Sequence, residues 1–140
     1  MLPRILVLLA ASISCNAAVT QTCRNVRFTS GAVKYTAIAL ASRTSGAAAV
    51  LIRLDEAAMV VSVSPLRSTS ALLVQQTKIN AEGLKFVFST AGVHQSCDLQ
   101  IDFEYKIVPG ESDAGYLRVT FESGTRVMIE AKPHRGTVNY

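Results

Sequence analysis

Residues 97–107 read Cys-Asp-Leu-Gln-Ile-Asp-Phe-Glu-Tyr-Lys-Ile, and every odd-numbered position in this stretch is apolar while every even-numbered one is polar or charged. Because successive side chains of a β-strand point to opposite faces, this period of two predicts a strand that is buried on one face. Cys97 has the same parity as Leu99 and Ile101, so we expect its side chain to point into the core.

The N-terminal segment determines which other cysteine is available to Cys97. Residues 1–17 have the layout of a secretory signal peptide, with a positive charge at Arg4, an apolar run over residues 5–11 and small residues at the end. The apolar run is much shorter than the roughly 20 residues that span a bilayer. We therefore expect a secreted or periplasmic protein with no transmembrane segment, whose residues 18–140 form a single β domain. Lipid attachment at Cys15 is the alternative to cleavage near residue 17.

A disulfide between Cys23 and Cys97 follows from either outcome, because Cys15 is cut off in one and carries a lipid in the other. These two cysteines then form an even pair in an oxidising compartment, where a structural disulfide is expected. Closing a loop of about 75 residues stabilises the fold by roughly 4 kcal/mol in the chain-entropy model.

Two further strands are predicted after residue 107. Turn residues fill 109–115, an alternating pattern covers 116–122, and Ser123-Gly124 leads into a second alternating pattern over 125–131. With residues 97–107 these segments predict an antiparallel meander. Its inward-facing side chains are expected to be Leu117, Val119, Phe121, Val127 and Ile129.

The N-terminal half has weaker patterns. Strands are predicted at Asn25–Thr29 and Ala32–Leu40. A hairpin is predicted from Ala47–Leu54 and Met59–Ser64, with a helix through Ala47–Ala58 as the alternative because alanine favours helices. Ala71–Thr77 and Leu84–Phe88 are predicted to form another hairpin.

Strands at this spacing predict an all-β fold. Eight or nine short strands, separated by turns every 8–12 residues or so, are typical of sandwiches and barrels. We expect an antiparallel two-sheet sandwich of about eight strands with one disulfide, and a small β-barrel is the alternative.

The sequence offers little catalytic chemistry. The two histidines, His94 and His134, are far apart and have no cluster of other metal ligands near them. The turn at 110–115 lacks the spacing of a nucleophile elbow. Asp102 and Glu104 share one strand face, an arrangement found in hydrolases but also on any solvated strand. We expect a protein that is not an enzyme and that has no cofactor or metal.

Charge is unevenly distributed along the chain. The net charge of +4 is too small to predict nucleic-acid binding. Residues 18–54 nevertheless hold basic side chains and no acid, whereas residues 98–113 hold five acids and one lysine. Either the basic residues contact an anionic partner, or the two segments are neighbours whose charges pair across strands, with Arg27 facing the acids.

These observations predict a non-catalytic binding module whose partner is a protein or an anionic surface polymer. The alternatives are a structural subunit of a cell-surface assembly that pairs through exposed strand edges, and a carrier of a small apolar ligand. The candidate partner-binding residues are Arg24, Arg27, Lys34 and Arg43.

Overall fold

The computed structural model describes residues 21–110, 116–122 and 125–133. The predictions for the signal peptide, Cys15, the turn at 111–115, His134 and the C-terminal tail lie outside these residues. The strands are β1 (Gln21–Thr22), β2 (Val26–Gly31), β3 (Gly46–Leu54), β4 (Val60–Ser68), β5 (Leu84–Phe88), β6 (Cys97–Ile107), β7 (Tyr116–Glu122) and β8 (Arg126–Lys132), and the helices are α1 (Ala37–Ala41) and α2 (Ala71–Glu82).

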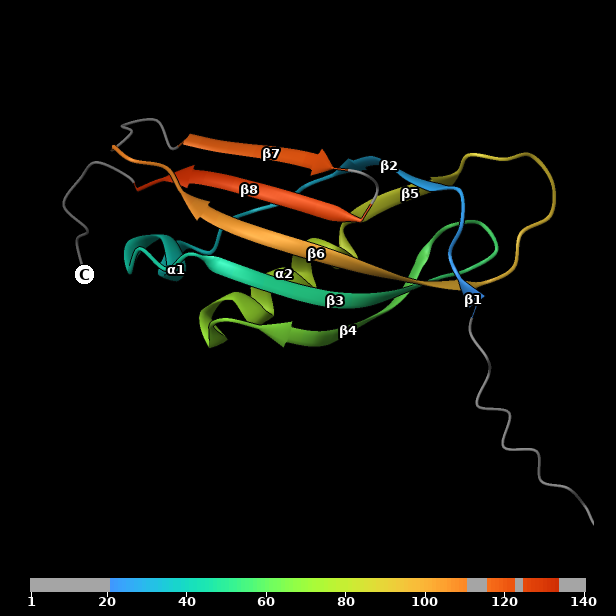
Figure 1. Ribbon diagram of the computed structural model, residues 1–140, viewed down its shortest axis with the longest axis horizontal. Coiled ribbons are helices and arrows are strands. Elements are labelled where there is room, and N and C mark those ends of the chain that lie inside the picture. The colour runs from blue at the N-terminus through green and yellow to red at the C-terminus, as the bar shows by residue number, and fades with distance from the viewer. Residues whose placement is uncertain (1–20, 111–115, 123–124, 134–140) are drawn as a thin grey trace, which may run out of the picture.

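Strand β6 lies in the middle of the main sheet, whose order is β4-β3-β6-β8-β7, and β1 pairs with the first residues of β6 (Figure 1). The predicted period of two is confirmed in β6, because Ile101 and Phe103 are completely buried while Gln100 is exposed. Cys97 is 4% exposed and faces the core, as expected.

The second layer of the fold combines a two-stranded sheet with the helices. Strands β2 and β5 form an antiparallel ribbon, and α2 packs on the same side of the main sheet against β3 and β4 (Figure 1). Phe28 joins the ribbon to the main sheet, since its ring centroid lies 5.1 Å from that of Phe86 and 4.9 Å from that of Phe121. The chain is mostly strand, and its described strands form two open sheets, so the sandwich is confirmed and the barrel is not formed.

The predicted strand at Ala71–Thr77 is wrong, because these residues form the first part of α2. Ser70 caps the helix by accepting a hydrogen bond from the Leu72 backbone N–H at 3.2 Å, and Gly83 follows its last residue. The buried side chains Leu73, Thr77 and Ala81 recur every four residues, which is helical spacing. Apolar residues at Leu72 and Val74, which are exposed, mask this spacing in the sequence.

The predicted strand at Ala32–Leu40 is also wrong. The chain runs without a strand from residue 32 to 36 and then enters α1, where the Thr36 hydroxyl accepts a hydrogen bond from the Ala39 N–H at 3.1 Å. Val33, Tyr35 and Ala39 are buried, so this segment contributes to the core without a strand partner. The alternation of apolar residues in this segment therefore reflects which side chains are buried, and it does not indicate that the segment pairs with another strand.

The C-terminal meander has a different order from the one predicted. Strand β8 pairs with β6 in parallel, with Phe103 opposite Val127, and β7 pairs with β8 from outside. The interior position goes to the strand with the fully buried face, since Val127 and Ile129 are completely buried. On the edge strand, Leu117 and Phe121 lie opposite the buried Ala131 and Val127 and so face inward as expected, but they remain 46% and 37% exposed because β7 has no neighbour on its outer side among the described strands.

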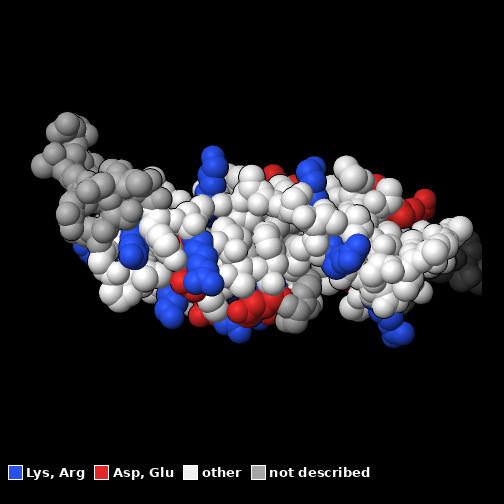
Figure 2. All heavy atoms as spheres, turned by 90° about the horizontal axis from the view of Figure 1, so that it is seen from above, with Lys and Arg blue, Asp and Glu red and all other residues white. Residues whose placement is uncertain are grey.

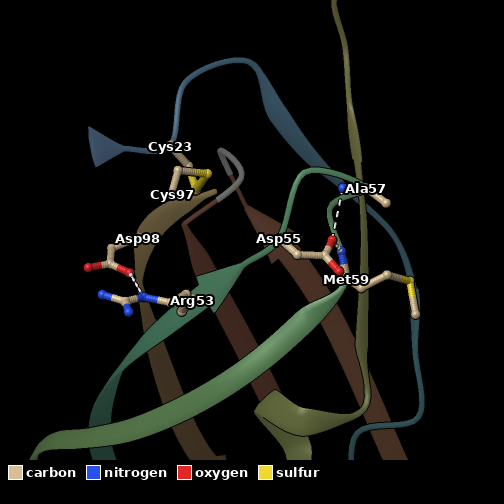
Figure 3. The surroundings of a disulfide bond; sticks show 7 residues. All are labelled: Cys23, Arg53, Asp55, Ala57, Met59, Cys97 and Asp98. Carbon is tan, nitrogen blue, oxygen red and sulfur yellow. Dashed lines mark hydrogen bonds and ion pairs between the residues drawn. A yellow bond between two sulfur atoms is a disulfide. The ribbon is translucent and has the colours of Figure 1, made fainter. Parts of the chain in front are cut away.

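The hairpin of β3 and β4 is confirmed in place of the alternative helix. Asp55 shapes its turn, because one carboxylate oxygen accepts hydrogen bonds from the backbone N–H groups of Ala57 at 2.8 Å and Met59 at 2.9 Å (Figure 3). Ala58 adopts a positive φ of 61° in this turn.

The predicted disulfide between Cys23 and Cys97 is present, with the two Cα atoms 4.8 Å apart (Figure 3). Cys23 lies between β1 and β2, so the alternation of neither strand dictates where its side chain points. Its backbone N–H donates to the carbonyl oxygen of Asp98 at 2.8 Å. The bond therefore holds the β1–β2 connection against the start of β6.

A buried polar cluster fixes α2 to the rest of the core. Asn80, 1% exposed, accepts from the Lys34 N–H at 2.9 Å, and its amide donates to the Lys34 carbonyl at 2.8 Å and to the Tyr105 hydroxyl at 3.0 Å. The Thr77 hydroxyl is 2.8 Å from the same Tyr105 oxygen. No buried side-chain nitrogen or oxygen among the described residues lacks a hydrogen-bond partner.

Candidate ligand-binding cleft

A polar cleft of about 730 Å³ lies at the disulfide end of the molecule, between the β1–β2 connection and the loop from β5 to β6. We call it the disulfide-end cleft. Most of its lining side chains carry hydrogen-bonding groups, and none of its described lining residues is an Asp or Glu. The lining consists of Gln21, Thr22, Arg24, Asn25, Phe88, Thr90, Val93, His94, Gln95 and Cys97.

One wall of the cleft is the β1–β2 connection. Its path is fixed by the disulfide at Cys23 and by Asn25, which has a positive φ of 57° that asparagine tolerates better than most residues. The Asn25 carbonyl accepts hydrogen bonds from the Ser89 N–H at 2.6 Å and the Ser89 hydroxyl at 2.9 Å. The backbone at Arg24 is therefore held between two fixed points, and its exposed side chain borders the cleft.

The opposite wall holds His94 in a defined orientation. Its ring stacks on Phe88, with the centroids 4.0 Å apart and the planes 12° from parallel. Its Nε2 is 2.8 Å from the Thr90 carbonyl oxygen, and because a carbonyl can only accept, Nε2 must carry the hydrogen. Nδ1 is then the acceptor of the neutral ring and becomes a second donor when the ring is protonated.

The four basic residues predicted to bind a partner do not form one patch. Arg24 borders the disulfide-end cleft, and Arg27 lies on the ribbon opposite Val87. Lys34 precedes α1 and Arg43 follows it, whereas β1 lies at the other end of the molecule (Figure 1). On the face drawn in Figure 2, Lys and Arg stand as separate groups with acids among them. Of the four, only Arg24 borders this cleft.

Three acids of β6 pair with arginines of the main sheet, and one of these, Arg53, comes from the basic segment 18–54, as one interpretation of the charge distribution predicted. Arg53 contacts Asp98 at 3.1 Å (Figure 3), Arg67 contacts Asp102 at 3.1 Å, and Arg126 pairs with Glu104. The specific prediction for Arg27 is wrong, because β2 pairs with β5 and not with β6. These pairs are partly exposed, so each contributes at most about 1 kcal/mol.

Sequence reasoning did not identify His94 as a site residue. A single histidine in a loop carries no motif, and its stacking on Phe88 depends on how the loop folds back after β5. The presence of an aromatic residue six positions earlier is the only local signal, and it is too common to be informative.

Comparison with known proteins gives no family for this chain: no family model matches it, and no curated protein is similar to it. No described helix is long and apolar enough to cross a membrane. Within the described ranges, no three His, Cys, Asp or Glu side chains are grouped so that they could hold a metal ion.

Proposed function

We propose that this protein is a non-catalytic binding module that acts outside the cytoplasm and recognises an anionic surface polymer in the disulfide-end cleft. The observation that carries the proposal is the composition of the lining. Arg24 supplies a permanent positive charge, His94 supplies a fixed ring whose Nδ1 can take part in a hydrogen bond, and no acid among the described lining residues opposes the charge of Arg24.

The remaining lining residues suit a carbohydrate polymer that bears carboxylates. The amides of Gln21, Asn25 and Gln95 and the hydroxyls of Thr22 and Thr90 both donate and accept hydrogen bonds, as sugar hydroxyls require. The stacked rings of Phe88 and His94 add a rigid flat surface. An apolar-ligand carrier is less well supported, because the lining of this cleft is mainly polar.

The extracytoplasmic setting is supported by the disulfide, which persists in oxidising compartments. The bond also stabilises one wall of the cleft, since it holds the β1–β2 connection beside β6. A reducing environment would release that connection.

Titration calorimetry with polygalacturonate, and with neutral dextran as the reference polymer, tests the proposal. We expect binding to polygalacturonate alone, weakened about tenfold or more by Arg24→Gln because a charge-assisted contact is lost. His94→Gln should also weaken binding, because it removes the ring that stacks on Phe88 in the wall of the cleft.

The matched control is Lys106→Gln, which removes one exposed positive charge from β6 and lies outside the lining of the cleft. Its affinity should equal that of the wild type. If Lys106→Gln and Arg24→Gln weakened binding equally, the effect would come from the net charge of the protein, and the proposed site would be refuted. If dextran bound as tightly as polygalacturonate, the choice of an anionic polymer would be refuted.

A further inference from the structure

Strand β7 forms one edge of the main sheet, and β4 forms the other (Figure 1). β7 pairs with β8 over all of its seven residues, from Tyr116↔Lys132 to Glu122↔Arg126, without a register shift, and it contains no proline or glycine. No described strand pairs with its outer side. A regular edge strand of this kind presents backbone N–H and C=O groups to which another strand can bind.

The β4 edge is less suited to strand addition. The register of β4 with β3 shifts twice, once past Val61 and once past Leu66. Such bulges twist an edge strand and interrupt its pairing. Pro65, between the two shifts, has no N–H to donate. Pairing of β7 with the β4 of another copy is therefore disfavoured, and β7 is the edge of the main sheet that can accept a strand.

The charges of β7 are arranged symmetrically about Thr120. Leu117 and Phe121 face the core side of the sheet, so Arg118, Thr120 and Glu122 share the face that α2 and the ribbon do not cover. Arg118 and Glu122 each lie two residues from Thr120. Antiparallel pairing with the β7 of a second copy about Thr120 places each Arg118 directly opposite a Glu122. Opposite charges at such positions stabilise strand pairing.

The same register suits the core side of the strand. Val119 lies opposite Phe121 of the second copy, and pairs of a β-branched and an aromatic side chain stabilise sheets. Phe121 is 37% exposed in one chain, so this pairing covers apolar surface. Each pair joins side chains of the same face, so the second layers of both copies lie on one side of the shared sheet.

Neighbouring registers leave the charges of β7 unmatched. Pairing about Arg118 puts the two arginines directly opposite each other, which is destabilising. Pairing about Val119 puts Arg118 opposite Thr120 and Glu122 opposite Tyr116. The placement of an arginine and a glutamate at equal distances from Thr120 is what a two-fold contact between identical strands requires. This symmetry favours a second copy over an unrelated strand.

Glu122 has only a weak hold on a cation of its own chain. Its carboxylate lies 3.6 Å from Arg126, whose guanidinium also pairs with Glu104. Both Glu122 and Arg126 are partly exposed, so Glu122 can accept a second cation from solvent or from a partner chain. Arg118 is exposed beside it on the same edge.

We propose that β7 pairs antiparallel with the β7 of a second copy, in a two-fold dimer centred on Thr120. The two main sheets then form one continuous sheet across both chains. No described lining residue of the disulfide-end cleft belongs to β7, so the contact leaves both clefts open.

Sedimentation equilibrium of the protein, expressed from the full sequence and purified as its host processes it, tests the proposal. We expect the wild type to pass from monomer to dimer as its concentration rises. Arg118→Glu should raise the dissociation constant more than about tenfold, because it puts two glutamates opposite each other at two places in the dimer. Glu122→Arg should act in the same direction, because it puts arginine opposite arginine.

An equimolar mixture of the two variants tests the register itself. In a mixed dimer, both glutamates of the first variant lie opposite arginines of the second. Dimers should therefore form in the mixture at concentrations where each variant alone is monomeric. A mixture that stays monomeric, with both variants shown to be folded by circular dichroism, would refute the pairing about Thr120.

The matched control is Arg27→Glu, which makes the same change of charge at an exposed position of β2. Its dissociation constant should equal that of the wild type. If Arg27→Glu weakened the dimer as much as Arg118→Glu, the effect would come from net charge, and the β7 contact would be refuted. A wild type that stays monomeric at all concentrations would refute the second copy, even if β7 bound a strand of a different protein.

Discussion

Two tyrosines meet in the core and share a protein environment that disfavours ionisation. The rings of Tyr35 and Tyr105 pack edge to face with their centroids 5.3 Å apart, and the Tyr35 hydroxyl donates to the Thr44 carbonyl. Burial, with a smaller contribution from Tyr105, raises the pKa of Tyr35 to about 12. Burial also raises the pKa of Tyr105, although its hydrogen bonds to Thr77 and Asn80 oppose the shift.

The raised pKa of Tyr35 predicts a loss of stability in alkali. Below pH 10 the tyrosine is neutral in both the folded and the unfolded chain, so it adds no pH dependence. Between pH 10 and about 12 the unfolded chain releases a proton that folded Tyr35 keeps, and the free energy of unfolding falls. Urea unfolding at half-unit intervals of pH measures the slope, and Tyr35→Phe should make it shallower. An unchanged slope in that variant would contradict the assignment.

At the scale of single residues, the sequence predicted the cysteines better than the histidine. The alternation within residues 97–107 predicted that Cys97 faces the core, and the assignment of Cys15 to the signal peptide or to a lipid anchor left Cys23 as its only partner. These two observations were enough to predict the disulfide. The placement of His94 against Phe88 depends on the path of a loop, and alternation says nothing about loops. The prediction for Arg27 failed for a related reason. The disulfide at Cys23 predicts that the chain lies beside β6 at that point, but it does not predict that the next strand, β2, pairs with β5.

Among the elements, α2 is attached to the core by the hydrogen bonds of Asn80 as well as by apolar packing. Asn80 makes hydrogen bonds to the backbone of Lys34, to Tyr105 and to Gln76, so it links the helix to the chain before α1 and to β6. The neighbouring helical contact with β3 and β4 is apolar, through side chains such as Leu73.

Asn80→Ala should lower the free energy of unfolding by about 2–4 kcal/mol. The substitution removes the side-chain partner of the partly buried N–H and carbonyl of Lys34, and it leaves the Tyr105 hydroxyl with Thr77 alone; each group left unsatisfied costs about 1–3 kcal/mol. Chemical unfolding monitored by circular dichroism measures the change. Gln75→Ala, an exposed amide on the same helix, is the control and should change the value by no more than about 0.5 kcal/mol. Equal effects of the two variants would show that Asn80 has no special role.

Among the elements, β6 was predicted from its period of two, and α2 was missed because its helical period is masked. β6 has one clearly buried face, so its alternation is clean, whereas the β3–β4 hairpin was predicted from its β-branched residues. Helix α2 exposes Leu72 and Ile79 and buries Thr77 and Asn80, the reverse of an ordinary amphipathic helix. Apolar residues on both sides of the helix removed the helical period from the sequence. The parallel pairing of β6 and β8 also has no local signal in the sequence. Alternation predicts which face of a strand is buried, but it does not predict which strand lies next to it.

For the whole molecule, the disulfide is the principal covalent constraint found among the described residues. It joins positions separated by 74 residues, and the chain-entropy model gives a stabilisation of about 4 kcal/mol for such a loop. We expect Cys23→Ala/Cys97→Ala to lower the free energy of unfolding by about that amount. The measurement is urea unfolding with and without dithiothreitol.

Reductant supplies the internal control for this experiment. It should destabilise the wild type and leave the double variant unchanged, since the variant has no bond to reduce. The double variant should also lose affinity for polygalacturonate, because the β1–β2 connection that carries Arg24 is no longer fixed beside β6. A double variant as stable as the oxidised wild type would show that the bond constrains nothing in the unfolded chain.

The Cys23–Cys97 bond also determines how the molecule would respond to being pulled. A force applied at residue 21 and at residue 133 passes from Cys23 through the two sulfur atoms to Cys97, so the chain between them carries none of the load. The β2–β5 ribbon, both helices and the β3–β4 hairpin lie within this covalent ring. Roughly 250 Å of contour, at about 3.4 Å per residue, is thereby withheld from extension. Under tension, β6, β7 and β8 would be drawn out first, and the ring closed by the disulfide would remain intact.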